Sequence, residues 1–229
     1  MNDGPMTGWR LIVRVLLLAV VFCALLFVPA GRLDWYEGWA FVVFYIAAVM
    51  AIYAWMMRRD PELARERQSR PEDQPTWDKV ITRSYSILAL VEFVLAALDS
   101  GRFFWSDVPV WGRVLGWGLL ALSLSLIWWV LATNTFASHA VRLQEDRQQR
   151  VIDSGPYAIV RHPMYVGVII CFLAVPLVLR SLWALIVGGV IVALFILRTA
   201  LEDRALQQGL PGYVDYAQRV RWRLIPGVW

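Results

Sequence analysis

Residues 163–197 read PMYVGVIICFLAVPLVLRSLWALIVGGVIVALFIL, two apolar runs of 17 residues each that only Arg180 separates. A helix rises about 1.5 Å per residue and the hydrocarbon core of a bilayer is about 30 Å thick, so about 20 residues cross it. Each run reaches that length with its flanking residues. The stretch therefore predicts two membrane-embedded helices, which either cross fully or form a tight hairpin.

Four further apolar runs precede this stretch. They are Val15–Gly31, Gly38–Met57, Ser84–Leu98 with Glu92 inside it, and the charge-free stretch Val114–Val141, whose apolar part ends near Leu131. Apolar residues make up 59% of the 229, charged residues 17%, and the mean hydropathy is +0.54. This composition excludes a disordered chain and a nucleic-acid-binding module. We expect an all-α integral membrane protein of about six transmembrane helices, forming a single membrane domain over residues 1–229.

The basic residues are distributed unevenly over the loops between these runs. With six spans, 18 of the 22 Arg and Lys residues fall on the side of both termini and four on the other side. Cytoplasmic loops carry the excess of basic residues. We therefore expect a multi-pass protein of the inner (plasma) membrane with both termini and a linker over residues 58–79 in the cytoplasm. Within the linker, Pro61–Gln68 is expected to form a short surface helix. Tryptophans near the opposite ends of the spans suggest an aromatic belt, namely Trp35, Trp39, Trp105 and Trp111.

Polar and turn residues gather in the loop 134–162, which ends in Arg161-His162-Pro163-Met164-Tyr165. Pro163 suits the first position of a helix, and free N–H groups there can hold an anion beside Arg161 and His162. Tyr157 and Tyr165 could stack on an aromatic ring. The pattern suits a ligand with a carboxylate and a base, and a helix cap with interfacial anchors is the alternative.

Two ionisable positions border or interrupt the apolar runs. Arg198 directly follows the last run and lies four residues before Glu202, so the two share a helix face. They are candidates for function, because ionisable groups at membrane depth are costly, and a snorkelling surface ion pair is the alternative. Glu92 either lines the active site or pairs inside the bundle. The chain has two His and two Cys, so we expect no metal site.

Four motifs in this order resemble a known family. They are Ser154-Gly155-Pro156-Tyr157, then Arg161-His162-Pro163-x-Tyr165-x-Gly167, then Arg198-x-x-x-Glu202-Asp203, and last Tyr213-x-x-Tyr216-x-x-Arg219-Val220 with Ile225-Pro226. Together they resemble the isoprenylcysteine carboxyl methyltransferase family, in a bacterial form, over residues 134–229. The family often has two Glu in sequence where Glu202 and Asp203 stand here, which leaves open which acid acts. Leu210-Pro211-Gly212 replaces a family Phe-Gly, which affects the path of the tail.

This resemblance implies an integral-membrane methyltransferase that uses S-adenosylmethionine. Residues 134–229 would form the methyltransferase core and residues 1–133 the first four spans. The cofactor would occupy a cytoplasmic pocket closed by the C-terminal tail, and a hydrophobic, prenylated or lipid substrate would enter from the bilayer. Arg198 and Glu202 match the family's substrate-side pair and are the expected catalytic residues. Carried over position by position, the cofactor contacts would be Gln144, Gln149, Arg150, Val151, Ile152, Tyr157, His162, Pro163, Met164 and Tyr165.

The nucleophile decides the roles of the catalytic pair. A carboxylate is already ionised and needs a cation, which Arg198 supplies in a bidentate fork while Glu202 orients it. An amine needs a base, and Glu202 is then the candidate. Two other functions stay open: an NADPH-dependent membrane sterol or steroid reductase with a similar Pro-x-Tyr-x-Gly turn, and a non-enzymatic transporter or scaffold centred on Glu92.

Overall fold

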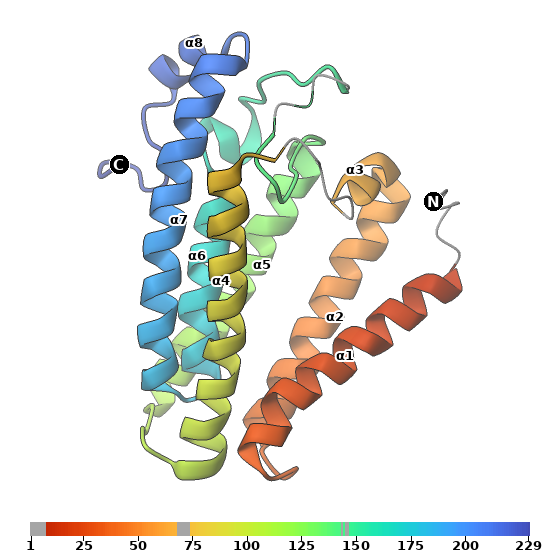
Figure 1. Cartoon of the computed structure of the whole chain (residues 1–229), viewed down its shortest axis with the longest axis vertical. Coiled ribbons are helices and arrows are strands. Elements are labelled where there is room, and N and C mark those ends of the chain that lie inside the picture. The colour runs from red at the N-terminus through yellow and green to blue at the C-terminus, as the bar shows by residue number, and fades with distance from the viewer. Residues whose placement is uncertain (1–7, 68–73, 143, 145–146) are drawn as a thin grey trace.

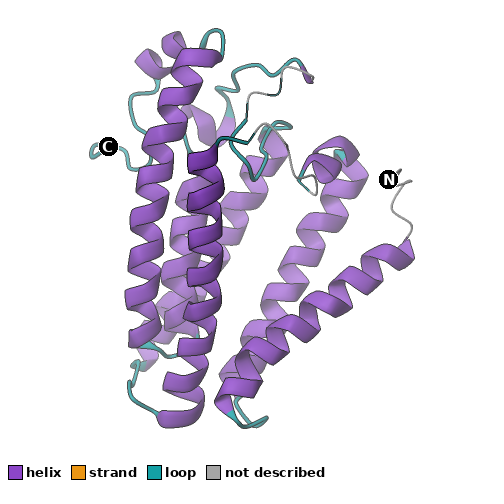
Figure 2. Cartoon of the chain, viewed as in Figure 1, coloured by secondary structure: helices purple, strands orange, loops and turns teal. Residues whose placement is uncertain are grey.

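The computed structural model describes residues 8–67, 74–142, 144 and 147–229, and all regular elements in this part of the chain are helical (Figure 2). Residues 68–73 of the expected linker, with the last residue of its expected surface helix, lie outside the described residues. The bounds of the elements are α1 Gly8–Ala30, α2 Tyr36–Arg59, α3 Pro61–Glu66, α4 Thr76–Ala96, the π-helix η1 Ala97–Phe103, α5 Val110–Thr133, the 3₁₀-helix η3 Gly155–Ala158, α6 Pro163–Val178, α7 Leu182–Gly209 and α8 Tyr213–Arg219.

Local sequence signals account for several of the helix starts. Asp60 accepts a hydrogen bond from the backbone N–H of Leu63 at 2.9 Å and caps α3, with Pro61 in the first turn. Ser181 caps α7 in the same way through the N–H of Ala184, at 3.0 Å. Pro163 opens α6, where its missing N–H leaves no hydrogen bond unmade.

Four of the helices form an antiparallel bundle in which α5 packs along α6, α4 along α7, and α6 against α7 (Figure 1). Helices α1 and α2 make a hairpin beside this bundle, and α1 leans away from it toward its N-terminal end. The loop 134–162, α3 and α8 gather at one end of the bundle. The turns that join α1 to α2 and α6 to α7 lie at the other end.

The apolar runs became the long helices, so the all-helical prediction is confirmed. Within the described ranges, four helices are long and apolar enough to cross a membrane: Tyr36–Arg59, Thr76–Phe103, Val110–Thr133 and Leu182–Gly209. Val15–Ala30 and Pro163–Val178 are shorter apolar helices. The third run starts earlier than expected, at Thr76, and continues through η1 to Phe103.

Glu92 and Trp35 lie in the protein interior. Glu92 faces the inside of the bundle and is 1% exposed. Its carboxylate oxygens have no hydrogen-bond partner among the described residues. The assignment of Trp35 to an aromatic belt is wrong. It is 3% exposed and packs edge-on to Phe27, whereas Trp39, Trp105 and Trp111 are exposed.

Gly188 of α7 lies against the backbone of α6, whereas its neighbour Gly189 faces open space. Alanine substitutions at these two positions therefore form a matched pair. A Cβ on Gly188 would lie 2.6 Å from the carbonyl oxygen of Phe172, whereas a Cβ on its neighbour Gly189 would meet no atom within 4 Å. Gly188→Ala should lower the melting temperature in detergent, because the backbones must move apart. Gly189→Ala should be neutral or stabilising by up to about 1 kcal/mol, the helix preference of alanine. Equal melting temperatures for the two variants would contradict this packing.

Candidate functional site

A cavity of about 730 Å³ lies at the end of the bundle that holds the loop 134–162 and α8. The loop, η3, the start of α6, the end of α7 and α8 all contribute to its wall. Nine of the ten predicted cofactor residues line it: Gln144, Gln149, Arg150, Val151, Ile152, Tyr157, His162, Met164 and Tyr165. The tenth, Pro163, is buried at the start of α6 and is not part of the wall.

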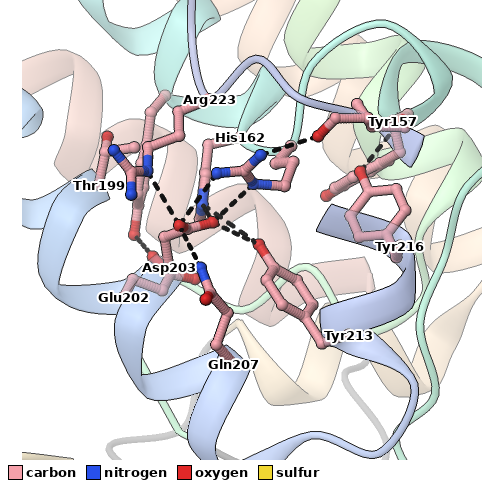
Figure 3. A network of polar contacts seen from close by, with 12 residues as sticks. Tyr157, His162, Thr199, Glu202, Asp203, Gln207, Tyr213, Tyr216 and Arg223 are labelled. Atoms are coloured by element: carbon pink, nitrogen blue, oxygen red, sulfur yellow. Dashed lines mark hydrogen bonds and ion pairs between the residues drawn. The ribbon is translucent and has the colours of Figure 1, made fainter. Parts of the chain in front are cut away.

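Asp203 is the centre of the polar network beside this cavity (Figure 3). It lies on α7, is 0% exposed, and accepts hydrogen bonds from the two residues before α6, from α7, from α8 and from the tail. Its partners are Arg161 at 2.7 and 3.0 Å, Gln207 at 2.8 Å, Arg223 at 2.9 Å, Tyr213 at 3.0 Å and His162 at 3.3 Å. A buried carboxylate is tolerated when cations and donors surround it in this way.

All three guanidinium nitrogens of Arg161, which also lines the cavity, donate hydrogen bonds within this network. Its guanidinium donates to both oxygens of Asp203 and to the carbonyls of Val220 and Arg221, each at 2.8 Å. Burial lowers the pKa of Arg161, and the bonds to Asp203 outweigh that effect and raise it. The N–H groups of Arg161 and His162 also donate to carbonyls of the tail, at 2.9 and 3.0 Å. The tail is thereby fastened across the start of α6.

Two tyrosines of α8 close the other side of the cavity. The hydroxyl of Tyr216 donates to the carbonyl of Tyr157 at 2.8 Å, and that of Tyr213 donates to Asp203. Asn134 donates to the hydroxyl of Tyr157 at 2.8 Å. Burial raises the pKa of Tyr157 to about 12, so this side chain is neutral at physiological pH. The tail therefore contributes wall residues, as a lid would.

Arg198 is held by a carboxylate that the sequence analysis did not single out. It is 3% exposed, its Nε donates to Asp78 at 2.7 Å and its Nη2 donates to the other oxygen of Asp78 at 3.2 Å. Nη2 also donates to the carbonyl of His139 at 2.7 Å. Asp78 lies in the first turn of α4, so the pair joins α4 to α7. The expected pairing of Arg198 with Glu202 does not form among the described residues, and the burial of Arg198 excludes a snorkelling surface pair.

Glu202 instead faces the cavity. Its carboxylate accepts a hydrogen bond from the hydroxyl of Tyr165, whose ring lies parallel to His162 with centroids 5.7 Å apart. The Arg198 guanidinium lies 5.2 Å from the centroid of the Tyr165 ring, and so it sits behind a wall residue of the cavity. Of the two adjacent acids, Asp203 has both oxygens hydrogen-bonded to other side chains, whereas the carboxylate of Glu202 lines the cavity and can contact a ligand.

The loop that carries Gln144 is braced from two directions. The Gln144 side chain donates to the carbonyl of Phe136 and accepts from Arg147, at 2.8 and 2.6 Å. Arg142 pairs with Glu66 of α3 at 3.0 Å. Gln144 therefore shapes the cavity wall as well as lining it. No group of three or more His, Cys, Asp or Glu side chains in the described part of the chain is placed to hold a metal ion.

Removal of the Asp203 charge should loosen the tail. Asp203→Asn leaves the buried Arg161 and the half-buried Arg223 without their counter-ion, and breaking a buried pair of this kind costs about 3–5 kcal/mol. We expect a lower melting temperature and faster tryptic cleavage after Arg219, Arg221 or Arg223. Asp215→Asn, on an exposed position of α8, is the matched control. A variant Asp203→Asn that melts and is cleaved like the control would remove Asp203 from this structural role.

Residues 111–210 match the family model described as phospholipid methyltransferase. The chain is 30% identical over 133 residues to the cobalt-zinc-cadmium resistance protein CzcN of Cupriavidus metallidurans, which covers 57% of each chain. It is 24% identical over 133 residues to the nickel-cobalt-cadmium resistance protein NccN of Alcaligenes xylosoxydans xylosoxydans, which covers 57% of this chain and 58% of that protein. The matched region thus spans little more than half the length of these relatives.

The matched residues 111–210 contain the Ser-Gly-Pro-Tyr motif, the Arg-His-Pro motif and the Arg198–Asp203 motif. The resemblance drawn from the sequence is therefore confirmed, and this region carries the pattern of the phospholipid methyltransferase family, which includes the isoprenylcysteine carboxyl methyltransferases.

Proposed function

We propose that this chain transfers the methyl group of S-adenosylmethionine to a hydrophobic acceptor carried by the membrane. One observation carries the proposal: Glu202 lines the same cavity as nine of the predicted cofactor residues. Glu202 lies on α7, just beyond the apolar part of that helix. A water-soluble cofactor and a lipid-borne acceptor can meet only at such a boundary. The family match over residues 111–210 supports the same reaction class.

The residues present fit this cofactor. Tyr157, Tyr165 and Tyr213 offer aromatic surface for an adenine ring and for a positively charged sulfonium, which aromatic faces attract. When bound, the cofactor supplies an electrophilic methyl group. Tyr165 and Glu202 would hold the acceptor side of the cavity, opposite the residues of the loop 144–152 that would hold the cofactor. The protein's part is to align the reactants and exclude water.

A carboxylate is our first candidate for the nucleophile. Arg198 uses its Nε and Nη2 for Asp78 and His139, and its Nη1 makes no hydrogen bond to the described residues. A carboxylate that reaches Nη1 would gain a charge-assisted hydrogen bond and lose no proton. In this arrangement Asp78, rather than Glu202, orients Arg198.

An amine is the second candidate, and the placement of Glu202 favours it. The charge of Arg198 is balanced by Asp78, whereas the Glu202 carboxylate faces the cavity. An amine that attacks the methyl group must lose a proton, and Glu202 can accept it. Tyr165, which donates to Glu202, would hold the carboxylate in position.

We further propose that the chain lies in the inner membrane with the cavity end in the cytoplasm, where S-adenosylmethionine is available. The 18-to-4 distribution of basic residues supports this orientation. The lipid bilayer is then the partner of the exposed apolar helix faces.

The proposal is tested with the purified protein in detergent. S-adenosylmethionine and S-adenosylhomocysteine should bind and raise the melting temperature by mass action, whereas NADPH should not. Transfer of radiolabelled methyl is then measured to a prenylcysteine acid and to an amine-bearing phospholipid. Labelling of the acid supports the first candidate and labelling of the phospholipid the second. Binding of NADPH alone would replace methyl transfer by the reductase function.

Variants of Arg198 separate a catalytic role from a purely structural one. Arg198→Ala should lower turnover about 100-fold or more while S-adenosylhomocysteine affinity stays within about twofold, as expected when a transition-state contact is lost. Arg198→Lys should restore only part of the activity, because an ammonium cannot hold Asp78 through a bidentate fork and also reach the acceptor. Arg204→Ala, on an exposed position of the same helix, is the control. Turnover near that of the control in Arg198→Ala would end the catalytic assignment.

A further inference from the structure

The tail folds back on itself after it has crossed the start of α6. The backbone N–H groups of Arg223, Leu224 and Ile225 donate to the carbonyl of Trp229, at 2.9, 3.0 and 3.3 Å. The guanidinium of Arg223 also lies 4.9 Å from the centroid of the Trp229 ring. Residues 222–229 therefore form a closed loop of defined shape, which we call the tail loop.

The tail loop packs against the apolar part of α7. Leu224 is buried in one apolar cluster with Ile191 and Phe195 of that helix, and Trp229 packs against the same cluster. Figure 1 shows the C-terminal end beside α7 and below α8. At 1.5 Å per residue, Phe195 and Ile191 lie about 3 and 9 Å before Leu197, where the apolar run of α7 ends. The tail loop thus lies at the level of the last turns of a helix that is long and apolar enough to cross a membrane.

The tail loop also exposes apolar side chains. Ile225 is 55% and Val228 is 73% exposed, and Trp222 is exposed as well. Ile196 and Leu197, in the same turns of α7, are exposed too. Segments that lie in a membrane interface bury their apolar side about 5–10 Å into the boundary between headgroups and acyl chains. The level of the tail loop falls within this range, and Trp side chains are common there.

We propose that the tail loop docks on the lipid bilayer, with Trp222, Ile225 and Val228 inserted at the level of the headgroups. The bilayer is the partner, rather than another protein, because the exposed side chains of the loop lie at the level of an exposed apolar segment of α7 that already faces lipid. Tyr213 and Tyr216, earlier in the same tail, line the cavity. Contact with the membrane therefore helps to hold the cavity wall in place, and this role does not depend on methyl transfer.

A fluorescent label on the tail loop tests the contact directly. Val228→Cys, with Cys23→Ala and Cys171→Ala to remove the native thiols, is labelled with nitrobenzoxadiazole and reconstituted into phosphatidylcholine nanodiscs. Nitroxide groups high on the acyl chains should quench this label at least about twofold, and aqueous iodide should quench it little. Asp215→Cys in the same background, on an exposed position of α8, is the control and should respond to iodide instead. A label at position 228 that responds like the control would overturn the inference.

Unlabelled variants test whether the membrane holds the tail. Ile225→Asn combined with Val228→Asn alters only exposed side chains, so the melting temperature should stay that of wild type. In nanodiscs, tryptic cleavage after Arg221 should be at least about fivefold faster, because the loop has lost its apolar contact with lipid. Val214→Asn, at an exposed apolar position of α8 outside the tail loop, is the matched control and should be cleaved like wild type. Equal cleavage rates for the double variant and this control would also overturn the inference.

Discussion

The buried carboxylate of Asp203 sets the geometry of the whole site. A carboxylate with no exposure to water requires cations and donors on every side, and it obtains them from segments far apart in the sequence: Arg161 and His162 before α6, Tyr213 on α8, and Arg223 in the tail. None of these segments can be displaced without leaving a buried charge uncompensated. The backbone bonds from Arg161 and His162 to the tail lie beside this network, and residues of the tail and of the start of α6 both line the cavity.

This arrangement also explains why two adjacent acids have different roles. Successive residues of a helix point about 100° apart, so Asp203 and Glu202 cannot face the same surroundings. Asp203 points into the structural network and Glu202 points toward Tyr165 and the cavity. One turn earlier, Arg198 is anchored to α4 by Asp78. A short segment of α7 thus carries three groups with different roles: Asp203 fastens the tail, Glu202 faces the cavity, and Arg198 is anchored to α4.

Most of the helices could be predicted from the sequence, because an apolar run reports directly on the length of an embedded helix. The wall of the cavity could also be predicted, through the motifs from Tyr157 to Tyr165 and the loop 144–152. The ion pairs between side chains on different elements could not be predicted from the sequence. Periodicity places Arg198 and Glu202 on one face of one helix, whereas the partner that holds Arg198 is Asp78, 120 positions away. The bond between Arg161 and Asp203 could not be predicted for the same reason, since only the folded chain brings the two residues together. Trp35 fits an interfacial position by sequence, yet the α1–α2 turn carries it inward against Phe27.

The charges on the membrane side of the cavity bear on what the site can accept. Arg198 and Asp78 together are neutral, which leaves Glu202 as the open negative group beside them at the cavity. A lone carboxylate that approached Glu202 would meet repulsion that a half-buried site screens poorly, unless a second cation received it. An amine would be attracted to Glu202 and would find there the base it needs. In the reaction proposed above, the charge that the acceptor presents to Glu202 would therefore select between the two nucleophiles, while the rest of the cavity wall can remain the same for both.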